Sequence, residues 1–473
     1  MHLNITMKTC FHLLITRGCF FLLFSFNCCV LNAQQKSDST DILYKKLDKY
    51  LISATENGKF NGSVLIEKNG TIILQKGYGW KNFPARTLND TSSIFPIGSL
   101  TKPFTAMVIL KLQEQGKISV HDLLSKYFPE QRDADKITIQ NLLNHTSGIY
   151  DFSHDIPEND SALLSHPIPR QKILDVFIHR ALEFKPGTHY SYCSSDYFLL
   201  GIIIEKLTGM PYEQMVRQLI FGPLGMHHSG FDFINLKDTS KTTGYKTFEA
   251  DKHELAVKWD STLAYASGAI YSTTGDLCKW ARAIAKRQIL TQSSWNQAFT
   301  PYLEHYGDGW WIDTLYDNQY IYHSGGLLGF MSSFRYYPDK DVTIILLNNF
   351  GYYGQTLLLV NNALSAIMFN KDNSLLSPRK PVSIEDSILR KYAGTYSQNG
   401  KDKIFITLRE HQLYAESSSK NGIPKLPIFA ESENNFFLKD FDAGFTFIKN
   451  ENNIVVKFIS HENGKEIEFR KIK

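Results

Sequence analysis

The sequence predicts an α+β protein, in which an antiparallel sheet is flanked by helices and joined to an all-helical region, with a small all-β domain at the C-terminal end. Three patterns predict this: alternating apolar and polar residues over 62–79, helical spacing of apolar residues through the middle of the chain, and short strand-like runs beyond residue 386. The 473 residues exceed what one hydrophobic core usually supports, so we expect two domains.

Residues 1–33 have the pattern of a signal peptide. Two basic residues precede the apolar run Cys19–Phe26, and Leu31–Ala33 offers a small-residue cleavage site. We therefore expect an exported protein, periplasmic or secreted, with a lipid anchor at Cys28-Cys29 as the lesser alternative. The apolar run is too short to span a bilayer, and no later segment approaches the roughly 20 continuous apolar residues that a spanning helix needs.

The composition limits the kinds of binding partner that we expect. The formal net charge of +4 and the absence of basic runs argue against nucleic acid, so we expect a small-molecule or peptide substrate. The oligomeric state is left open. Four of the six cysteines fall in the predicted signal peptide, and Cys193 and Cys278 are too few for a disulfide scaffold. Whether these two pair stays open.

Residues 34–370 form the predicted large domain. It begins with a hairpin over 62–79, because both residues of Asn69-Gly70 tolerate the positive φ of a tight turn. A helix is expected at Lys102–Gln115, with Gly116 as its stop. Further helices are expected at Thr138–His145 and Asp196–Leu207, the second capped by Ser194 or Ser195, and strands at Tyr320–His323, Phe330–Tyr337 and Val342–Asn348.

A second domain follows a linker. Residues 371–385 are polar and contain two prolines, as expected of a linker, and residues 386–473 predict a small β sandwich or barrel without chemistry of its own. Its strands are expected at Lys403–Leu408, Phe436–Leu438, Phe445–Lys449, Ile454–Ile459 and Ile467–Phe469.

Ser99 and Lys102 carry the first chemical signal. They lie three residues apart where the predicted helix starts, so one helical turn places the hydroxyl and the amine on the same face. A serine hydroxyl is a weak nucleophile unless a neighbour accepts its proton, and a lysine accepts one only when burial lowers its pKa. The free N–H groups at a helix start favour the oxyanion of acyl transfer, and the Ser99 N–H is a natural half of an oxyanion hole.

This S-x-x-K spacing is not specific by itself. Ser377–Lys380 and Ser417–Lys420 have it too, but they fall in the predicted linker and β domain with no apolar helix following. The alternative interpretation is that Ser99 is an exposed helix cap and Lys102 a solvated side chain. The apolar surroundings favour Ser99 as the nucleophile.

Two further segments strengthen that interpretation. Tyr192-Cys193-Ser194 precedes a predicted helix, and a phenol beside an ammonium group ionises more easily and passes a proton to a leaving group. His323-Ser324-Gly325-Gly326 ends a predicted strand, where glycines let a substrate approach the backbone closely. Taken singly, the first is typical of a half-buried tyrosine and the second of a glycine-rich bend.

In combination and order, these three elements resemble the serine β-lactamase and penicillin-binding-protein superfamily, and most closely its class C-like branch. The likeness covers roughly residues 43–368. It is carried in addition by four stretches in the expected order, Phe95–Lys102, Leu142–Gly148, Tyr197–Gly201 and Ala266–Thr273.

The resemblance implies a role for each segment. Ser99 would be the nucleophile, with Lys102 and Tyr192 handling its proton; which of the two is the general base stays open. The N–H groups of Ser99 and Gly326 would form the oxyanion hole, and no metal or cofactor is needed. Four residues would contact the substrate: His323, Ser324, Gly325 and Ser194.

Two departures from the family pattern bear on the substrate. Ser194 stands where asparagine is usual and lacks an amide's paired donor and acceptor, and His323 stands where β-lactamases carry lysine and is largely neutral near pH 7. His145 and Cys193 are expected to be structural. The leading hypothesis is a serine hydrolase that forms an acyl-enzyme at Ser99 from a peptide, amide or ester, including cell-wall-like substrates with D-residues. A β-lactamase of the same mechanism is one alternative, and a catalytically silent ligand-binding protein is the alternative from another class.

Overall fold

The computed structural model describes residues 40–157, 160–246, 253–351, 356–371, 381–400, 402–418, 425–438, 443–462 and 465–473. The chain divides into two compact units, residues 1–50 and 51–473. In the first unit, the described residues 40–50 are helical. The predicted signal peptide and its lipid-anchor alternative lie outside the described residues. No helix in the described ranges is both long and apolar enough to cross a bilayer.

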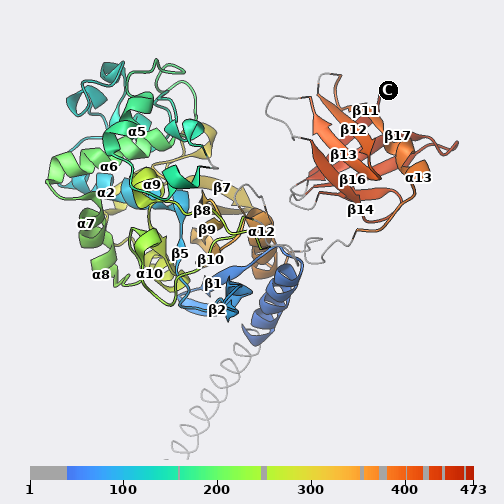
Figure 1. Ribbon diagram of the computed structural model, residues 1–473, viewed down its shortest axis with the longest axis horizontal. Helices are drawn as coiled ribbons and strands as arrows, with labels where there is room; N and C mark the ends of the chain where they lie inside the picture. The colour runs from blue at the N-terminus through green and yellow to red at the C-terminus, as the bar shows by residue number, and fades with distance from the viewer. Residues whose placement is uncertain are drawn as a thin grey trace, which may run out of the picture. The chain divides into compact units, whose positions relative to one another are not determined.

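A six-stranded antiparallel sheet lies at the centre of the larger domain of the second unit (Figure 1). Its order, β2-β1-β10-β9-β8-β7, places the early hairpin beside strands that follow more than two hundred residues later. Asn69 and Gly70 have φ angles of 50° and 71°, as the predicted turn requires. The strands are β1 (Gly62–Lys68), β2 (Thr71–Tyr78), β7 (Trp311–Leu315), β8 (Asn318–Leu327), β9 (Phe330–Tyr337) and β10 (Val342–Asn348).

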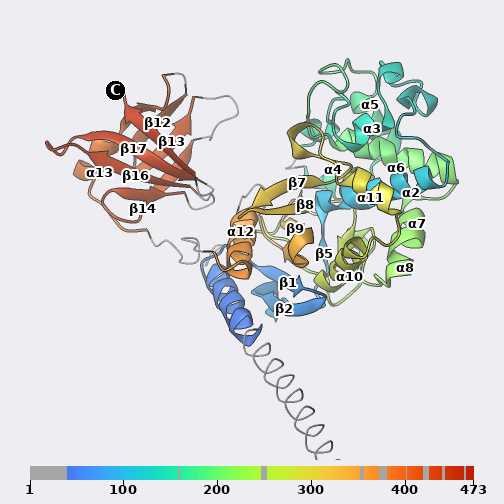
Figure 2. The same ribbon diagram turned by 180° about the vertical axis from the view of Figure 1, so that it is seen from behind.

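Helices cover both faces of this sheet, as Figures 1 and 2 show from opposite sides. Phe334 and Arg335 are consecutive on β9, so their side chains point to opposite faces. The Phe334 ring lies 5.1 Å from the ring of Trp280 on α10 (Thr274–Ala285). Arg335 donates instead to the side chains of Asn362 and Ser365 on α12 (Thr356–Met368).

A helical region adjoins the α10 face of the sheet. Its longest members, α2 (Lys102–Glu114) and α6 (Ser194–Thr208), are buried around most of their circumference and contribute to the main core. The remaining helices are short: α3 (Ile139–Leu143), α4 (Ser161–Leu164), α5 (Arg170–Phe177), α7 (Tyr212–Val216), α8 (Gly222–Leu224), α9 (Ser261–Gly268) and α11 (Gln292–Ala298). Two small sheets accompany them, β3 (Trp80–Asn82) with β4 (Thr87–Leu88) and β5 (Phe95–Pro96) with β6 (Tyr271–Ser272).

The expected caps of α6 are wrong. The helix begins at Ser194, its N-cap is Cys193, and no side chain caps it. The Ser195 hydroxyl accepts from the Phe152 N–H and donates to the Tyr150 carbonyl, so it anchors a neighbouring loop instead. Cys193 and Cys278 are both buried and free, which answers the open question of their pairing.

The C-terminal domain is a closed eight-stranded barrel. Of the two predicted architectures, a β sandwich or a barrel, the structure has the barrel. Aromatic rings of Tyr392, Tyr396, Phe436, Phe447 and Phe458 fill its interior. Its elements are α13 (Asp386–Tyr392), β11 (Gly394–Ser397), β12 (Lys403–Arg409), β13 (Gln412–Ser417), β14 (Leu426–Ala430), β15 (Asn435–Phe437), β16 (Ala443–Lys449), β17 (Val455–Glu462) and β18 (Lys465–Lys471). Most of the predicted linker, residues 372–380, lies outside the described residues. The predicted α+β fold class is confirmed.

Candidate active site

Ser99 lies where a short strand leads into a buried helix. It is the second residue of the 3-10 turn η1 (Gly98–Thr101), which continues directly into α2. Gly98 has a φ of 54°, and a β-carbon there would lie 2.8 Å from the backbone nitrogen of Gly326. Position 98 therefore requires glycine, and the turn that carries Ser99 lies directly against the backbone of β8. The Ser99 N–H is one of the groups that such a turn leaves without an internal partner.

The end of β8 is fixed to this turn from the other side. A β-carbon at Gly325 would lie 1.8 Å from the carbonyl oxygen of Ile97, so only glycine fits. Ser332 on β9 donates a hydrogen bond of 2.7 Å to the same carbonyl. These contacts hold the backbone of Gly325 and Gly326 beside the Ser99 turn.

Lys102 is fully buried beneath Ser99. Its Nζ donates to Ser99 Oγ at 3.1 Å and to the Ser267 carbonyl oxygen at 3.1 Å. Burial lowers the pKa of Lys102 to about 8, although the nearby Asp151 and Asp196 act in the opposite direction. A substantial fraction of the amine is therefore neutral near pH 8, which a proton acceptor requires.

Tyr192 lies on the other side of that amine. Lys102 Nζ is 4.7 Å from the centroid of the Tyr192 ring. Burial raises the pKa of Tyr192, and a hydrogen bond with Ser99 opposes the rise without cancelling it. The expectation that this phenol ionises more easily is therefore not met, because desolvation of the phenolate outweighs its neighbours. Tyr192 holds its proton at neutral pH.

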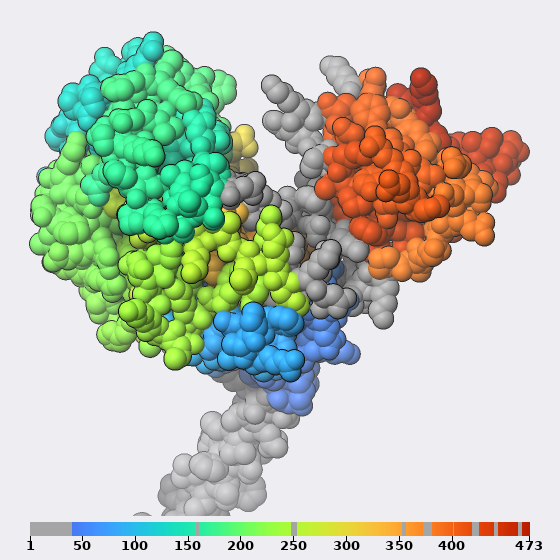
Figure 3. Space-filling view, in the orientation of Figure 1, coloured from blue at the N-terminus to red at the C-terminus, as the bar shows by residue number. Residues whose placement is uncertain are grey.

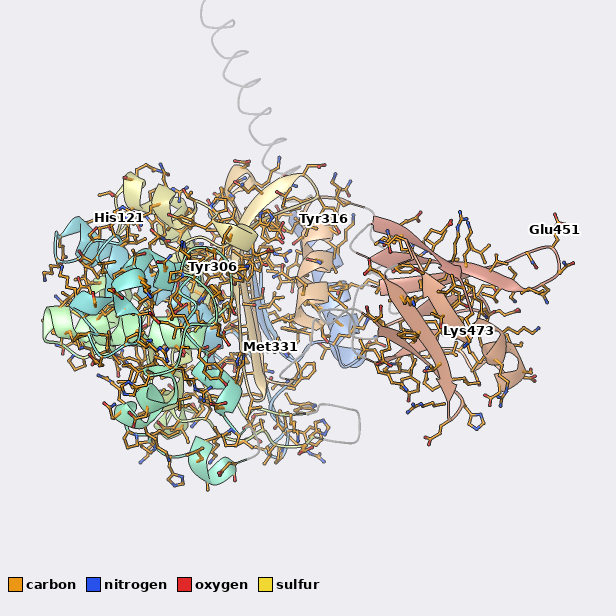
Figure 4. All side chains as sticks on the ribbon, turned by 90° about the horizontal axis from the view of Figure 1, so that it is seen from above. His121, Tyr306, Tyr316, Met331, Glu451 and Lys473 are labelled. Carbon is orange, nitrogen blue, oxygen red and sulfur yellow. The ribbon has the colours of Figure 1, made fainter. Side chains whose placement is uncertain are left out.

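His323 is buried beside Tyr192, with the centroids of the two rings 6.3 Å apart. Its side chain is 1% exposed, Nε2 lies 3.0 Å from the Tyr306 hydroxyl, and Nδ1 lies 2.6 Å from the Ser324 carbonyl oxygen. A carbonyl oxygen only accepts, so Nδ1 carries the proton and Tyr306 donates to Nε2. Burial lowers the pKa of His323 to about 3, and the Lys102 charge lowers it further. The ring is therefore neutral, and both of its nitrogens form hydrogen bonds within the protein. Figure 4 shows Tyr306 between the helical region and the sheet.

Two of the residues expected to contact the substrate carry hydroxyls: Ser194 follows Tyr192 by two residues, and Ser324 lies on β8. Ser194 is half-buried on the first turn of α6, and Ser324 is exposed on β8. Neither hydroxyl forms a hydrogen bond with another described residue. Both are therefore free to contact a ligand from the positions at which the sequence predicts substrate contacts.

Sequence reasoning missed an aromatic and acidic lining around Lys102. The His145 ring lies 4.5 Å from the Tyr192 ring and 4.9 Å from the Tyr306 ring, centroid to centroid. His145 Nδ1 lies 3.1 Å from Asp196 Oδ2. Burial lowers the pKa of His145 and raises that of Asp196. His145 thus supports Tyr192 from behind, in keeping with its expected structural role. No sequence signal marks Tyr306, whereas Asp196 could have been noticed one turn from Tyr192.

Two other segments have the S-x-x-K spacing. Ser377–Lys380 lies outside the described residues, and so does Lys420 of the other segment. Ser417 itself ends β13 in the barrel. Within the described ranges, no three His, Cys, Asp or Glu side chains are grouped so that they could hold a metal ion.

Comparison with known families decides the identity of the larger domain. Residues 47–361 match the family described as Beta-lactamase. The chain belongs to the beta-lactamase family. The predicted resemblance is thereby confirmed. Residues 378–471 match a second family, described as a domain of unknown function (DUF3471), which covers the barrel of this beta-lactamase family member.

Relatives agree with this assignment along most of the chain. Penicillin-binding protein 4* of Bacillus subtilis (strain 168) is 28% identical over 457 residues, which cover 90% of this chain and 98% of that protein. The octameric penicillin-binding protein homologue from Pyrococcus abyssi shares the fold with a TM-score of 0.65 and 24% identity, covering 90% of this chain and 99% of that chain. A D-amino acid amidase from Ochrobactrum anthropi SV3 shares it with a TM-score of 0.63 and 21% identity, covering 69% of this chain and 99% of that chain.

Proposed function

We propose that this beta-lactamase family member is a serine hydrolase that forms an acyl-enzyme at Ser99. The observation that carries the proposal is the 3.1 Å contact of Lys102 Nζ with Ser99 Oγ, made by an amine whose pKa burial lowers to about 8. A buried amine of low pKa is costly to a fold and serves no purpose in passive binding, but it suits a general base. The silent binding protein is therefore the weaker alternative.

The acylation step follows from the positions of these groups. Neutral Lys102 takes the Ser99 hydroxyl proton while Oγ attacks the substrate carbonyl carbon. The N–H groups of Ser99 and Gly326 stabilise the oxyanion. When the intermediate collapses, the C–N or C–O bond breaks and the leaving group takes the phenol proton of Tyr192, which is replaced from the Lys102 ammonium. Water then attacks the ester at Ser99 through the same groups in reverse, releasing the acid.

Tyr192 is the acid in this scheme and Lys102 the base. The raised pKa of Tyr192 keeps its proton available for the leaving group, and the lowered pKa of Lys102 leaves its lone pair available for Ser99. The reverse assignment would require a buried phenolate at Tyr192, whose formation is opposed by burial and by the nearby Asp151.

The substrate class we propose is a peptide, amide or ester, with D-residue peptides included. Two of the similar proteins, penicillin-binding protein 4* and the D-amino acid amidase, support this range by their names. The neutral, internally bonded His323 supports peptidase or esterase activity over efficient β-lactam hydrolysis, since it offers no charge for a substrate carboxylate. Ser194 and Ser324 would make the polar contacts to the substrate.

The arrangement of the whole chain is part of the proposal. We propose a cleaved signal peptide at residues 1–33, a hydrolase domain at 34–370, a linker at 371–385 and a barrel domain at 386–473, in an exported protein. N-terminal sequencing of the protein recovered from the culture medium or periplasm would test the first element, and a start near Gln34 is expected.

Kinetics with three substrates test the proposed activity. A p-nitrophenyl ester, a D-alanyl p-nitroanilide and benzylpenicillin would be compared in the wild type and Ser99→Ala, with Ser161→Ala as a control at an exposed serine. We expect turnover of the ester or the anilide, lost by at least about a thousandfold only in Ser99→Ala. A penicillin adduct that persists for hours would agree with a penicillin-binding hydrolase, and rapid penicillin turnover would favour the β-lactamase. No turnover and no adduct would support the silent binding protein.

A further inference from the structure

A cavity of about 190 Å³ lies beyond the end of β8, next to the Ser99 turn. Its lining is largely apolar and includes Phe233, Val257, Trp259, Leu327 and Phe330, but also two lysines, Lys241 and Lys258. An engineered cavity of roughly 150 Å³ binds benzene, so this one is large enough for an aryl or branched alkyl group. The loop that lines much of it is yellow-green in Figure 3 and adjoins the blue surface near residue 80, where the Thr243 N–H donates to the Lys81 carbonyl.

The cavity begins at the segments that hold Ser99. Pro96 and Ala269 line it, and Pro96 is two residues before Gly98. A β-carbon at Gly268 would lie 3.6 Å from the carbonyl carbon of Gly98. Leu327 directly follows Gly326, the proposed second half of the oxyanion hole. A group attached to a carbonyl at Ser99 therefore reaches the cavity by following β8 past Gly326.

The cavity lies on the acyl side of the scissile bond. Tyr192 and Lys102 are next to His323 at the start of this stretch of β8, and the leaving group must point toward them to be protonated. Leu327 lies four residues further along the strand, which is about 13 Å at the rise of an extended chain. The acyl portion of a substrate, on the other side of the carbonyl from the leaving group, points in that direction.

The two lysines give this apolar cavity a positive rim. Lys241 Nζ donates 2.8 Å to the Ile234 carbonyl and lies over the Phe233 ring, while Lys258 is exposed. Neither forms an ion pair with a described residue. Burial and then the Lys258 charge lower the pKa of Lys241, with the nearby Asp232 acting in the opposite direction. Two like charges at one cavity repel each other, and an anion between them relieves that repulsion.

We propose that this cavity selects acyl groups that combine an aryl or branched alkyl body with a distal carboxylate, held by Lys241 and Lys258. The proposal rests on the proposed acyl-enzyme at Ser99 and names its substrate class. It places recognition of negative charge at the acyl end of the substrate, whereas His323, at the leaving-group end, is neutral and hydrogen-bonded within the protein.

Three p-nitrophenyl esters with the same leaving group test the proposal. The acyl groups are 3-phenylpropanoyl, the same group with a para-carboxylate, and the same group with a para-aminomethyl substituent. In the wild type we expect kcat/KM for the carboxylate ester to exceed that for the unsubstituted ester by about tenfold, a typical value for a charged hydrogen bond. The aminomethyl ester should be the poorest substrate. Added salt should reduce the carboxylate preference and leave the unsubstituted ester unaffected.

Lysine variants assign the effect to this cavity. Lys258→Met and Lys241→Met should each lower the preference several-fold, their double variant should abolish it, and Lys241→Arg should retain it. Lys286→Met, at an exposed lysine on the end of α10, is the matched control and should change nothing. If the unsubstituted ester is hydrolysed but the wild type shows no carboxylate preference, or if the double variant keeps it, the lysine proposal is overturned. If no ester is hydrolysed at all, it is the acyl-enzyme proposal that fails.

Discussion

The Tyr306 hydroxyl donates a hydrogen bond of 3.0 Å to Nε2 of His323. Because the other ring nitrogen is bonded to the Ser324 carbonyl, His323 is held on β8 as a neutral residue with both ring nitrogens bonded within the protein. The segment His323–Gly326 thus acts on the site through its backbone. The histidine ring holds the Ser324 carbonyl, and Gly325 and Gly326 lie against the turn that carries Ser99.

Tyr306→Phe should destabilise the protein by about 1–3 kcal/mol, because it leaves the buried Nε2 of His323 without a donor. Urea unfolding followed by fluorescence measures the change. Tyr302→Phe, at a tyrosine 42% exposed, is the control and should stay within about 0.5 kcal/mol of the wild type. Equal stability of the two variants would contradict the assigned hydrogen bond.

The rate of acylation should follow the ionisation of Lys102. Because the neutral amine is the active form and its pKa is about 8, the second-order rate constant for a fluorophosphonate should rise with pH and reach half its plateau near pH 8. Lys102→Arg, whose guanidinium stays protonated, should react at least about a hundredfold more slowly. A rate independent of pH between 6 and 9 would show that Lys102 is not the base.

The same lysine should cost stability at neutral pH. Its pKa falls from 10.5 to about 8 on folding, a difference of about 3 kcal/mol. Below pH 8 the amine is charged in both states and the full cost is present; between 8 and 10.5 only the unfolded state binds the proton, so stability rises with pH. Lys102→Met should therefore be inactive yet about 1–3 kcal/mol more stable at pH 7, and the gain should vanish near pH 10.5. Denaturation at both pH values measures it, with Lys286→Met as the unchanged control.

Gly325→Ala should disable the site without touching a reacting group. The new methyl would meet the Ile97 carbonyl at 1.8 Å and push β8 away from the Ser99 turn. We expect fluorophosphonate labelling to slow by about a hundredfold, the usual cost of losing an oxyanion-hole donor. Gly275→Ala, on α10 with its nearest neighbour at 3.5 Å, is the control.

A second variant tests the same contact with Ile97 without the backbone clash that Gly325→Ala introduces. Ser332→Ala removes only the 2.7 Å bond to the Ile97 carbonyl and should slow labelling by roughly tenfold in a protein with an unchanged circular dichroism spectrum. Normal labelling of both variants would separate the Ile97 contacts from the reactivity of Ser99.

Local patterns predicted much of the fold. Asn69-Gly70 marked the hairpin because its turn chemistry is local, and Gly116 was expected to stop α2 because a left-handed residue ends a helix; its φ is 68°. The expected caps at Ser194 and Ser195 were wrong, since tertiary contacts of the Ser195 hydroxyl with Tyr150 and Phe152 replace capping. Barrel strands β11, β13 and β14 escaped detection because their alternation is short and interrupted.

In the candidate site, too, relationships between residues close in sequence were predicted, and those between distant segments were not. The sequence placed Ser99 and Lys102 one turn apart, which is a local relationship, and the structure brings Tyr192 and β8 to the same place. The partners of Lys102 and His323 that come from distant segments, Ser267 and Tyr306, have no local signal. The balance between burial and charge at Tyr192 also depends on the completed fold, so its pKa direction could not be read from neighbouring residues.

The central claim is that Ser99 is a nucleophile activated by Lys102, and intact-mass spectrometry after fluorophosphonate treatment tests it most directly. We expect one adduct per chain in the wild type, located on the peptide that contains Ser99, none in Ser99→Ala, and normal labelling in Ser161→Ala. A folded wild-type protein that takes up no label, or an adduct that persists in Ser99→Ala, would contradict the claim.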